Sequence, residues 1–337
     1  MAGASGRRTG AMALVGAALL FALPWVCRGA DGQSGGILSL NFENDLFYGN
    51  DRNYTNGVRA AWLSGPDDTP DWAVRTAAWF PLFPERCCVR TEYAVGQNMY
   101  TPADISLSNP PPDDRPYAGW LYASIGVIAE TDDRLDQLGL SIGVVGPASF
   151  AEQTQKFVHR HVGSPRPQGW DTQLDNEPGI VLTYQRSWRE FVSRTLITGL
   201  PYDITPHVGG AFGNVFTYLD AGLMLRVGQN LPLDYGPPRI QPSLPGSGFF
   251  LAGDRFGWYL FAGVEGRAVA HNIFLDGNTF SDSRSVDKKP LVGDLQFGLA
   301  LTWQDVRLSY THVLRTAEFE TQRGGDDFGA LSLSVRF

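Results

Sequence analysis

The sequence is poor in charged residues and in cysteine, and each shortage argues against a class of protein. Charged residues make up only 18% of the 337 residues, and no basic stripe compensates for the net charge of −8. A nucleic-acid partner is therefore not expected, because binding to phosphates needs clustered Lys and Arg. Two of the three cysteines, Cys87 and Cys88, are adjacent. Adjacent cysteines would close a small, strained ring, so we expect no disulfide framework.

Long apolar runs are also missing, except near the N-terminus. Arg7 and Arg8 precede an apolar segment, and small residues follow it near Gly29. This order is typical of a secretory signal peptide, which we expect to comprise residues 1–30. An uncleaved membrane anchor is the alternative, but the apolar run is short and Pro24 interrupts its end. No later stretch reaches the roughly 18–20 continuous apolar residues of a membrane helix.

The rest of the chain shows segments of about ten residues in which apolar and polar or small residues alternate. In the last segment, Leu331, Leu333 and Val335 share one face with the terminal Phe337. A soluble β-sandwich also alternates, but export, aromatic residues near the strand ends and a terminal aromatic residue favour a barrel in lipid. Twelve such segments occur. We therefore predict an all-β fold, a single transmembrane outer-membrane β-barrel of about 12 antiparallel strands over residues 31–337.

The parity of the connections places the polar motifs at one end of this barrel. If the first strand rises from the periplasm, every odd-numbered connection is extracellular. Most polar motifs lie in these odd connections, which span roughly residues 46–53, 101–117, 147–178, a turn near Gly213, 271–290 and 317–327. Two even connections, 66–90 and 229–256, are long, and the sequence suggests no role for them. We therefore expect a functional site on the extracellular-leaflet side.

The first of these polar motifs, residues 41–57, follows a strand-like run and includes Glu43, Asn44, Asp45 and Asp51. Their hard oxygen atoms suit Ca²⁺ better than Zn²⁺. Their spacing is not that of an EF-hand loop, so the spacing alone is weak evidence for a metal. On the residues alone, turn residues on a solvated rim are the preferred interpretation, and a metal site is the alternative.

One of the five histidines stands out by its surroundings. His159 lies in residues 151–163, where Phe157 and Val158 contribute to a pattern that predicts a short amphipathic helix in an external loop. We expect these two apolar residues to hold the helix against the barrel wall. His161 would point elsewhere on the helix, so a zinc site made by the two histidines is not expected.

A nucleophilic serine motif is absent from the sequence. The chain contains no GxSxG elbow. The polar motif that ends at Gly57 offers Thr55 rather than a serine, and no histidine adjoins it. A mechanism in which a base activates water therefore fits better than a covalent mechanism.

Six stretches of the chain form an ordered set of motifs: NDLFYGNDRNYTNG, GQNMYTPADIS, DDRPYAGWLY, VVGPAS with the VH downstream, GWDTQLDNEP, and HNIFLDGNTF with SVDKKP. Together these motifs resemble the lipid A 3′-O-deacylase family of Gram-negative outer membranes. The match is ordered and extends through nearly the whole chain after the expected signal peptide. The resemblance implies a barrel enzyme that uses Ca²⁺ to hydrolyse the ester holding the 3′-linked acyloxyacyl group of lipid A.

The resemblance also implies roles for single residues. His159 would be the general base on water, and Asp45 would be a Ca²⁺ ligand. Asn44 would help to bind the ion or the oxyanion. Thr55 and Glu177 lie in matching motifs and are carried over as catalytic residues.

One position departs from the family pattern. Where the resemblance leads us to expect a Lys that reaches a lipid A phosphate, this chain has Ala103. We therefore expect the contacts to the substrate head group to fall to Arg115, Lys288 or Lys289.

The expected function is that of an outer-membrane lipid A 3′-O-deacylase, a carboxylic ester hydrolase. The expected partners are lipid A in lipopolysaccharide as the substrate, outer-membrane lipid and the barrel-assembly machinery. Two alternatives stay open. An outer-membrane phospholipase A would need a Ser beside a His, and a non-enzymatic porin-like barrel would need large external loops but no clustered Asn-Asp and His.

Overall fold

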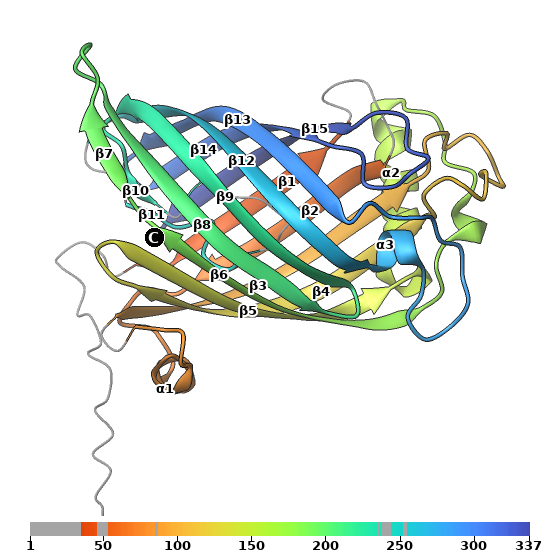
Figure 1. Cartoon of the computed structure of the whole chain (residues 1–337), viewed down its shortest axis with the longest axis horizontal. Coiled ribbons are helices and arrows are strands. Elements are labelled where there is room, and N and C mark those ends of the chain that lie inside the picture. Colours follow the sequence, from red (N-terminus) through yellow and green to blue (C-terminus); the bar gives the residue numbers. More distant parts are fainter. Residues whose placement is uncertain (1–34, 46–52, 85–86, 235, 237–243, 252–254) are drawn as a thin grey trace, which may run out of the picture.

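The computed structural model describes residues 35–45, 53–84, 87–234, 236, 244–251 and 255–337, which form a closed barrel (Figure 1). The expected signal peptide, residues 1–30, lies outside the described residues. Twelve antiparallel strands form the wall: β1 (Ile37–Asn44), β2 (Asn53–Leu63), β3 (Cys88–Thr101), β4 (Ala118–Glu130), β5 (Arg134–Val145), β6 (Glu177–Trp188), β8 (Pro201–Gly213), β9 (Phe216–Gln229), β12 (Gly257–Asn272), β13 (Leu291–Trp303), β14 (Val306–Arg315) and β15 (Asp326–Arg336). The predicted fold class and number of strands are confirmed.

The ring closes because β1 pairs with both β2 and β15, and β6 pairs with β8. A closed ring satisfies the backbone hydrogen bonds of every wall strand, as a structure within lipid requires. A short strand, β7 (Val192–Thr195), extends from the ring by pairing with the start of β8. Among the described residues, no helix is long and apolar enough to cross a membrane.

The wall is apolar on its outer face and polar on its inner face. In β1, the side chains of Leu38, Leu40 and Phe42 are exposed, whereas Ser39 and Asn41 between them are buried. Because successive side chains of a strand point to opposite faces, the exposed apolar set lies on the outside of the barrel. This arrangement is the reverse of a water-soluble sheet and fits a barrel whose outer face contacts lipid.

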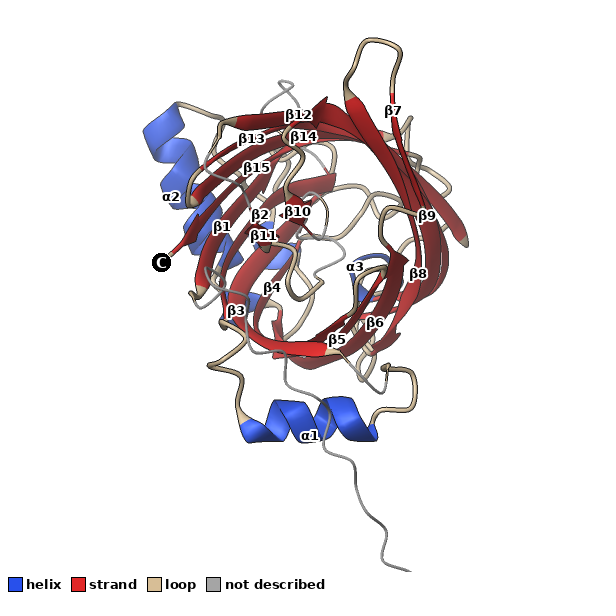
Figure 2. Ribbon diagram, turned by 90° about the vertical axis from the view of Figure 1, so that its left-hand side faces the viewer, coloured by secondary structure: helices blue, strands red, loops and turns tan. Residues whose placement is uncertain are grey.

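The lumen contains ion pairs and part of the long connection 229–256. Arg226 pairs with Asp203 at 2.7 Å and with Asp234 at 2.6 Å, and Asp234 belongs to a small inner hairpin of β10 (Leu233–Asp234) and β11 (Phe250–Leu251). The guanidinium of Arg307 donates to the carbonyl oxygen of Phe249 at 3.0 Å. Figure 2 shows β10 and β11 inside the ring of strands. The described residues of this connection therefore lie in the periplasmic end of the lumen, a role that the sequence did not suggest.

The other long connection, 66–90, lies outside the wall. It contains α1 (Asp71–Trp79), whose Ala73 and Ala77 pack in a buried apolar cluster with Cys87 and residues of β3 and β4 (Figure 2). The Cys87 thiol is free. Burial, helped by the nearby Asp136 carboxylate, raises the pKa of this thiol to about 11. At neutral pH Cys87 is therefore a protonated, apolar packing residue.

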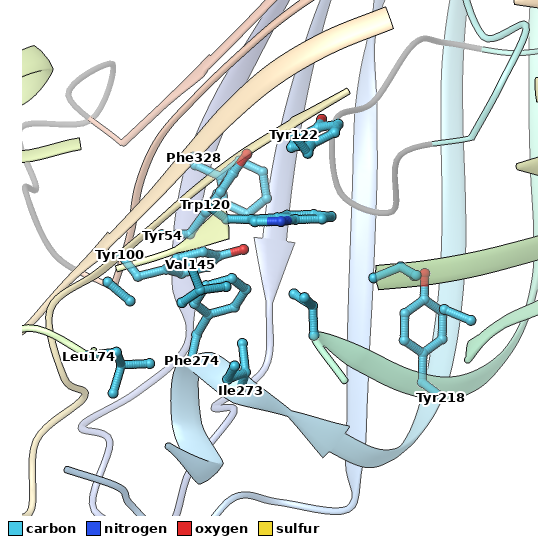
Figure 3. Packing of buried hydrophobic residues seen from close by; sticks show 14 of the residues in the cluster. Tyr54, Tyr100, Trp120, Tyr122, Val145, Leu174, Tyr218, Ile273, Phe274 and Phe328 are labelled. Carbon is cyan, nitrogen blue, oxygen red and sulfur yellow. The ribbon is translucent and has the colours of Figure 1, made fainter. Parts of the chain in front are cut away.

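Aromatic side chains close the lumen near its external end. Tyr100 stacks on Phe274 with ring centroids 4.0 Å apart, and Trp120 stacks on Tyr122 at 4.3 Å. Figure 3 shows these rings gathered with Tyr54 and others in one buried cluster. Phe274 comes from α3 (Ile273–Asp276), so the cluster ties an external connection to the wall. The external end of the barrel is thus a packed platform.

Candidate site on the outer wall

The outer face of β1 changes from apolar to polar at its external end. Asn44 follows Leu38, Leu40 and Phe42 in the same outward alternation, yet it is only 5% exposed. The next residue, Asp45, is 2% exposed. Buried polar side chains on the lipid-facing side of a barrel are expensive unless other groups satisfy them. This position is therefore a candidate functional site.

A β-bulge brings a further polar residue to the same face. The pairing of β2 with β3 shifts register between Tyr54 and Asn56, so Thr55 is an extra residue in its strand. Tyr54 points into the lumen, where its hydroxyl donates to Glu43 at 2.7 Å. Thr55 instead shares a hydroxyl hydrogen bond of 2.7 Å with Thr101, which alternates with the exposed outer residues of β3. The bulge therefore turns Thr55 to the outside.

The helix predicted around His159 is confirmed as α2 (Ala151–Val162), and it lies against this part of the wall. A Cβ added to Gly119, on the outer face of β4, would approach the Cβ of Ala151 to 2.3 Å. The amide of Gln97 on β3 donates to the carbonyl oxygen of Ser149, just before the helix, at 2.6 Å. Figure 2 shows α2 projecting beyond the outline of the ring of strands. The helix thus covers the outer wall rather than the lumen.

The residues that α2 turns toward the protein differ from those we expected. Ala151, Gln155 and His159 are buried and follow each other at intervals of four, so they share one face of the helix. Phe157 is 61% exposed, so the expectation that it holds the helix against the wall is wrong. It falls midway between two buried positions, and a helix turns such a residue to the opposite side. The Gln155 side chain instead anchors the helix by accepting a hydrogen bond from Trp170 at 2.7 Å.

The ring of His159 is held in a defined orientation. Its Nδ1 lies 2.6 Å from the carbonyl oxygen of Pro165. Because a carbonyl oxygen can only accept, Nδ1 carries the proton, and in the neutral ring Nε2 keeps the lone pair that a general base needs. His161 is exposed, and its Nδ1 lies 2.8 Å from the carbonyl oxygen of Phe157 within the same helix. The two histidines therefore face different surroundings, as the helical pattern predicted.

The residues beside Asn44 and Asp45 suit a hard cation in their chemistry. The amide of Asn44, the carboxylate of Asp45 and the hydroxyls of Thr55 and Thr101 are all oxygen donors in a buried setting, and Ca²⁺ prefers such ligands. Among the residues that the structure describes, His, Cys, Asp and Glu form no group of three or more that could hold a metal. Among the described residues, a Ca²⁺ site here would use the Asp45 carboxylate together with neutral oxygen donors. Asp51, the other expected acidic residue, lies outside the described residues.

Glu177 lies apart from this group. It precedes the exposed Ile180 and Leu182 in the alternation of β6, so its side chain points inward. Its carboxylate accepts hydrogen bonds from the Asn214 side chain at 2.9 Å and from the Thr279 backbone at 2.8 Å. These contacts join three external connections to one another. A catalytic role for Glu177 stays a prediction, and the inward orientation of its side chain does not support it.

The three cations predicted to bind the head group are all ion-paired. Arg115 is fully buried and donates to Glu318 at 2.7 Å, Lys288 contacts Asp276 at 2.9 Å, and Lys289 contacts Glu320 at 3.3 Å. Their role toward substrate stays a prediction.

These ion pairs affect the carboxylates. Burial alone would raise the pKa values of Glu318 and Asp276. At Glu318, the charges of Arg115, Arg315 and Arg267 together outweigh burial, so its pKa is lowered. At Asp276, hydrogen bonds from His271, Lys288 and the Asn272 backbone, together with the charge of Lys288, outweigh burial and lower the pKa.

Sequence reasoning missed several members of the site. Thr101 lies in a motif that we quoted, but an alternating pattern does not show where a bulge in the neighbouring strand brings Thr55 to the same face. The Pro165 carbonyl was missed because any residue supplies a backbone oxygen. A spacing of four between Gln155 and His159 was the available signal for the buried face of α2.

Comparison with known proteins agrees with this architecture. A family model described as outer membrane protein LpxR matches residues 14–337. The structure of LpxR from Salmonella typhimurium matches with a TM-score of 0.72 at 20% sequence identity, covering 89% of this chain and 100% of that chain. At this identity the likeness establishes the fold.

Other solved barrels match less well. The outer membrane enzyme PagL gives a TM-score of 0.27 at 12% identity, with 47% of this chain and 90% of that chain covered. The beta domain of the Bordetella autotransporter BrkA gives 0.44 at 9% identity, with 90% and 99% covered. No curated protein sequence matches. Because the family model spans nearly the whole sequence, the chain belongs to the outer membrane protein LpxR family, which confirms the expected resemblance to outer-membrane lipid A deacylases.

Proposed function

We propose that this chain removes the 3′-linked acyloxyacyl group of lipid A by hydrolysing its ester with water activated by His159. The observation that carries the proposal is the buried polar patch on the outer wall, at the external ends of β1 to β3 and beside α2. A lipid in the outer leaflet reaches this surface directly by lateral movement. A site in the lumen would not be open to it.

In this proposal, His159 Nε2 takes a proton from water as the water oxygen attacks the ester carbonyl carbon. The hydrogen bond from Nδ1 to Pro165 stabilises the imidazolium that forms, because both ring nitrogens are then donors. The proton next passes to the alkoxide oxygen of the sugar as the ester bond breaks, and the acid leaves. Asn44 and Thr55 supply polar contacts for the carbonyl oxygen on the wall.

We also propose that Ca²⁺ binds at Asp45 and Asn44. When bound, it would stabilise negative charge on the ester oxygen. The support is the chemistry of the donors: a buried carboxylate next to a buried amide at the end of β1, with two threonine hydroxyls on the neighbouring strands.

The partners follow from the location. The substrate is lipid A within lipopolysaccharide, and the outer face contacts the surrounding lipid. We propose that the barrel-assembly machinery inserts the chain, because β15 alternates apolar and polar residues as the strands of a membrane barrel do.

The direct test is mass spectrometry of lipid A from cells that express the chain. The expected result is a loss of mass equal to the 3′-linked acyloxyacyl group, and the His159→Ala variant should leave lipid A intact at equal expression. Release of fatty acid from glycerophospholipid with lipid A unchanged would instead favour the phospholipase A alternative.

A further inference from the structure

The exposed cations near His159 differ from those that we expected to bind the substrate. Arg160 and Arg166 are exposed, and among the described residues neither side chain forms an ion pair. By contrast, Arg115 is fully buried against Glu318. A cation without a carboxylate partner is available to bind an anion.

Both arginines flank the proposed general base. Arg160 follows His159 in α2, and Arg166 follows Pro165, whose carbonyl oxygen contacts the His159 ring at 2.6 Å. The backbone of Arg166 is held because its carbonyl oxygen accepts a hydrogen bond from the Gln168 side chain at 3.3 Å. The segment that orients the catalytic ring therefore also places Arg166.

This segment runs beside the position where a lysine is missing. The backbone of Gln168 donates to the carbonyl oxygen of Ile105 at 2.9 Å. Gln168 is two residues from Arg166, and Ile105 is two residues from Ala103, which is exposed. Two carboxylates near Ala103 are already engaged. Asp104 accepts hydrogen bonds from the backbone and hydroxyl of Ser106, at 2.9 Å and 2.6 Å, and Asp114 accepts one from the backbone N–H of Ala103 at 2.8 Å.

The same helix also presents apolar surface. Phe157 is 61% exposed, and Phe150 at the start of α2 is 58% exposed. Exposed aromatic side chains next to unpaired cations suit a ligand that combines acyl chains with an anionic head group. Lipid A is such a ligand, since its sugars carry phosphates next to its acyl chains.

We infer that Arg166, assisted by Arg160, binds a phosphate of lipid A in place of the lysine that Ala103 does not supply. This inference rests on the proposed function and names the residue that recognises the head group. A guanidinium suits the role because it contacts two phosphate oxygens at once.

The test measures kcat and KM on phosphorylated lipid A and on lipid A freed of phosphate. Wild-type protein should prefer the phosphorylated form. In Arg166→Gln this preference should fall by about 10- to 100-fold, mainly through KM, since the charge-assisted contact between the guanidinium and the phosphate is lost. Arg194→Gln is the matched control, because Arg194 is an exposed arginine on the periplasmic hairpin. Ala103→Lys in the Arg166→Gln background should restore part of the preference. An unchanged preference in Arg166→Gln overturns the inference.

Binding separates this inference from the proposed function. The dissociation constants of both lipid A forms are measured in the His159→Ala background with and without Arg166→Gln. A phosphate-dependent loss of affinity on removal of Arg166 supports the inference even if wild-type protein cleaves neither lipid. Equal affinities with and without Arg166 overturn it, whatever the activity.

Discussion

At the scale of single residues, the orientation of a side chain decides its function more than its type. His159 and His161 are two residues apart on α2, but only His159 is buried on the wall-facing side, with Nδ1 held by Pro165. His161 packs its ring against Phe157, 4.3 Å between centroids, on the exposed side. The same residue type thus occupies two different environments.

We predict that His159→Ala lowers turnover by about 10²- to 10⁴-fold, which is the usual contribution of a general base. His161→Ala should change turnover by less than about tenfold, because its ring contacts only its own helix. Acyl release from lipid A in detergent measures both. A larger loss of turnover in His161→Ala would assign the general base to His161 instead.

A second residue-scale prediction concerns Asp45. Asp45→Ala should abolish Ca²⁺ binding measured by calorimetry, because it removes the carboxylate from a set of otherwise neutral oxygen donors. The variant should keep the heat-modifiable migration of a folded barrel, since Asp45 lies beyond the last residue of β1. Glu43→Gln is the control, because that carboxylate faces the lumen and contacts Tyr54. Undiminished Ca²⁺ binding by Asp45→Ala would show that the ion is held elsewhere.

At the scale of elements, close approach between α2 and β4 determines whether the site is assembled. Gly119 allows this approach, since a Cβ there would lie 2.2 Å from Ser149 Oγ and 2.3 Å from Ala151 Cβ. Gly119→Val should therefore displace the start of α2, at a cost of about 1–3 kcal/mol for overpacking. We predict that Gly119→Val loses most of its activity. Heat-modifiable migration in gel electrophoresis should show that the barrel is still folded. Leu121→Val, at an exposed outer position of the same strand, should keep its activity.

The external connections depend on carboxylates with lowered pKa values, Asp276 and Glu318. A carboxylate whose pKa is lower in the folded state stabilises that state at pH values above its unfolded pKa of about 4. This stabilisation disappears as the pH falls through the folded pKa. We predict that pepsin cleaves the external connections of the Asp276→Asn, Glu318→Gln variant faster than those of the wild type at pH 5. The two rates should converge as the pH falls below about 4. A constant difference between the two cleavage rates down to pH 2 would show that these two carboxylates do not stabilise the external connections.

At the scale of the whole molecule, the barrel is filled inside and carries the proposed site on its outer wall. Aromatic rings pack across the external end of the lumen, and ion pairs of Arg226 with Asp203 and Asp234 tie the inner hairpin to the wall (Figures 2 and 3). This filling does not support the porin-like alternative.

We predict that purified protein shows no steady ion conductance in planar lipid bilayers. Asp234→Ala should raise the frequency of open events, because it leaves Arg226 and Arg307 without a shared partner next to the inner hairpin. Removing one partner of a buried ion pair typically costs about 3–5 kcal/mol. Stable conductance by the wild type would show that the connection does not fill the lumen in the membrane.

The sequence by itself determined the barrel. Alternation of period two depends only on neighbouring residues, so it revealed twelve strands, their outward apolar faces and, through parity, the external position of the polar motifs. The family motifs indicated His159 and Asp45 for the same reason, since each motif is a local stretch of the chain.

Only the tertiary structure decided which of these residues share a surface. The bulge at Thr55 depends on the register between two strands, and the burial of His159 rather than Phe157 depends on which side of α2 meets the wall. Glu177 lies in a matching motif, yet its strand turns it inward toward Asn214. The role of residues 229–256 also depended on tertiary contacts, because their partners are lumen side chains from distant strands. Such choices arise from packing between distant segments, which a local pattern does not encode.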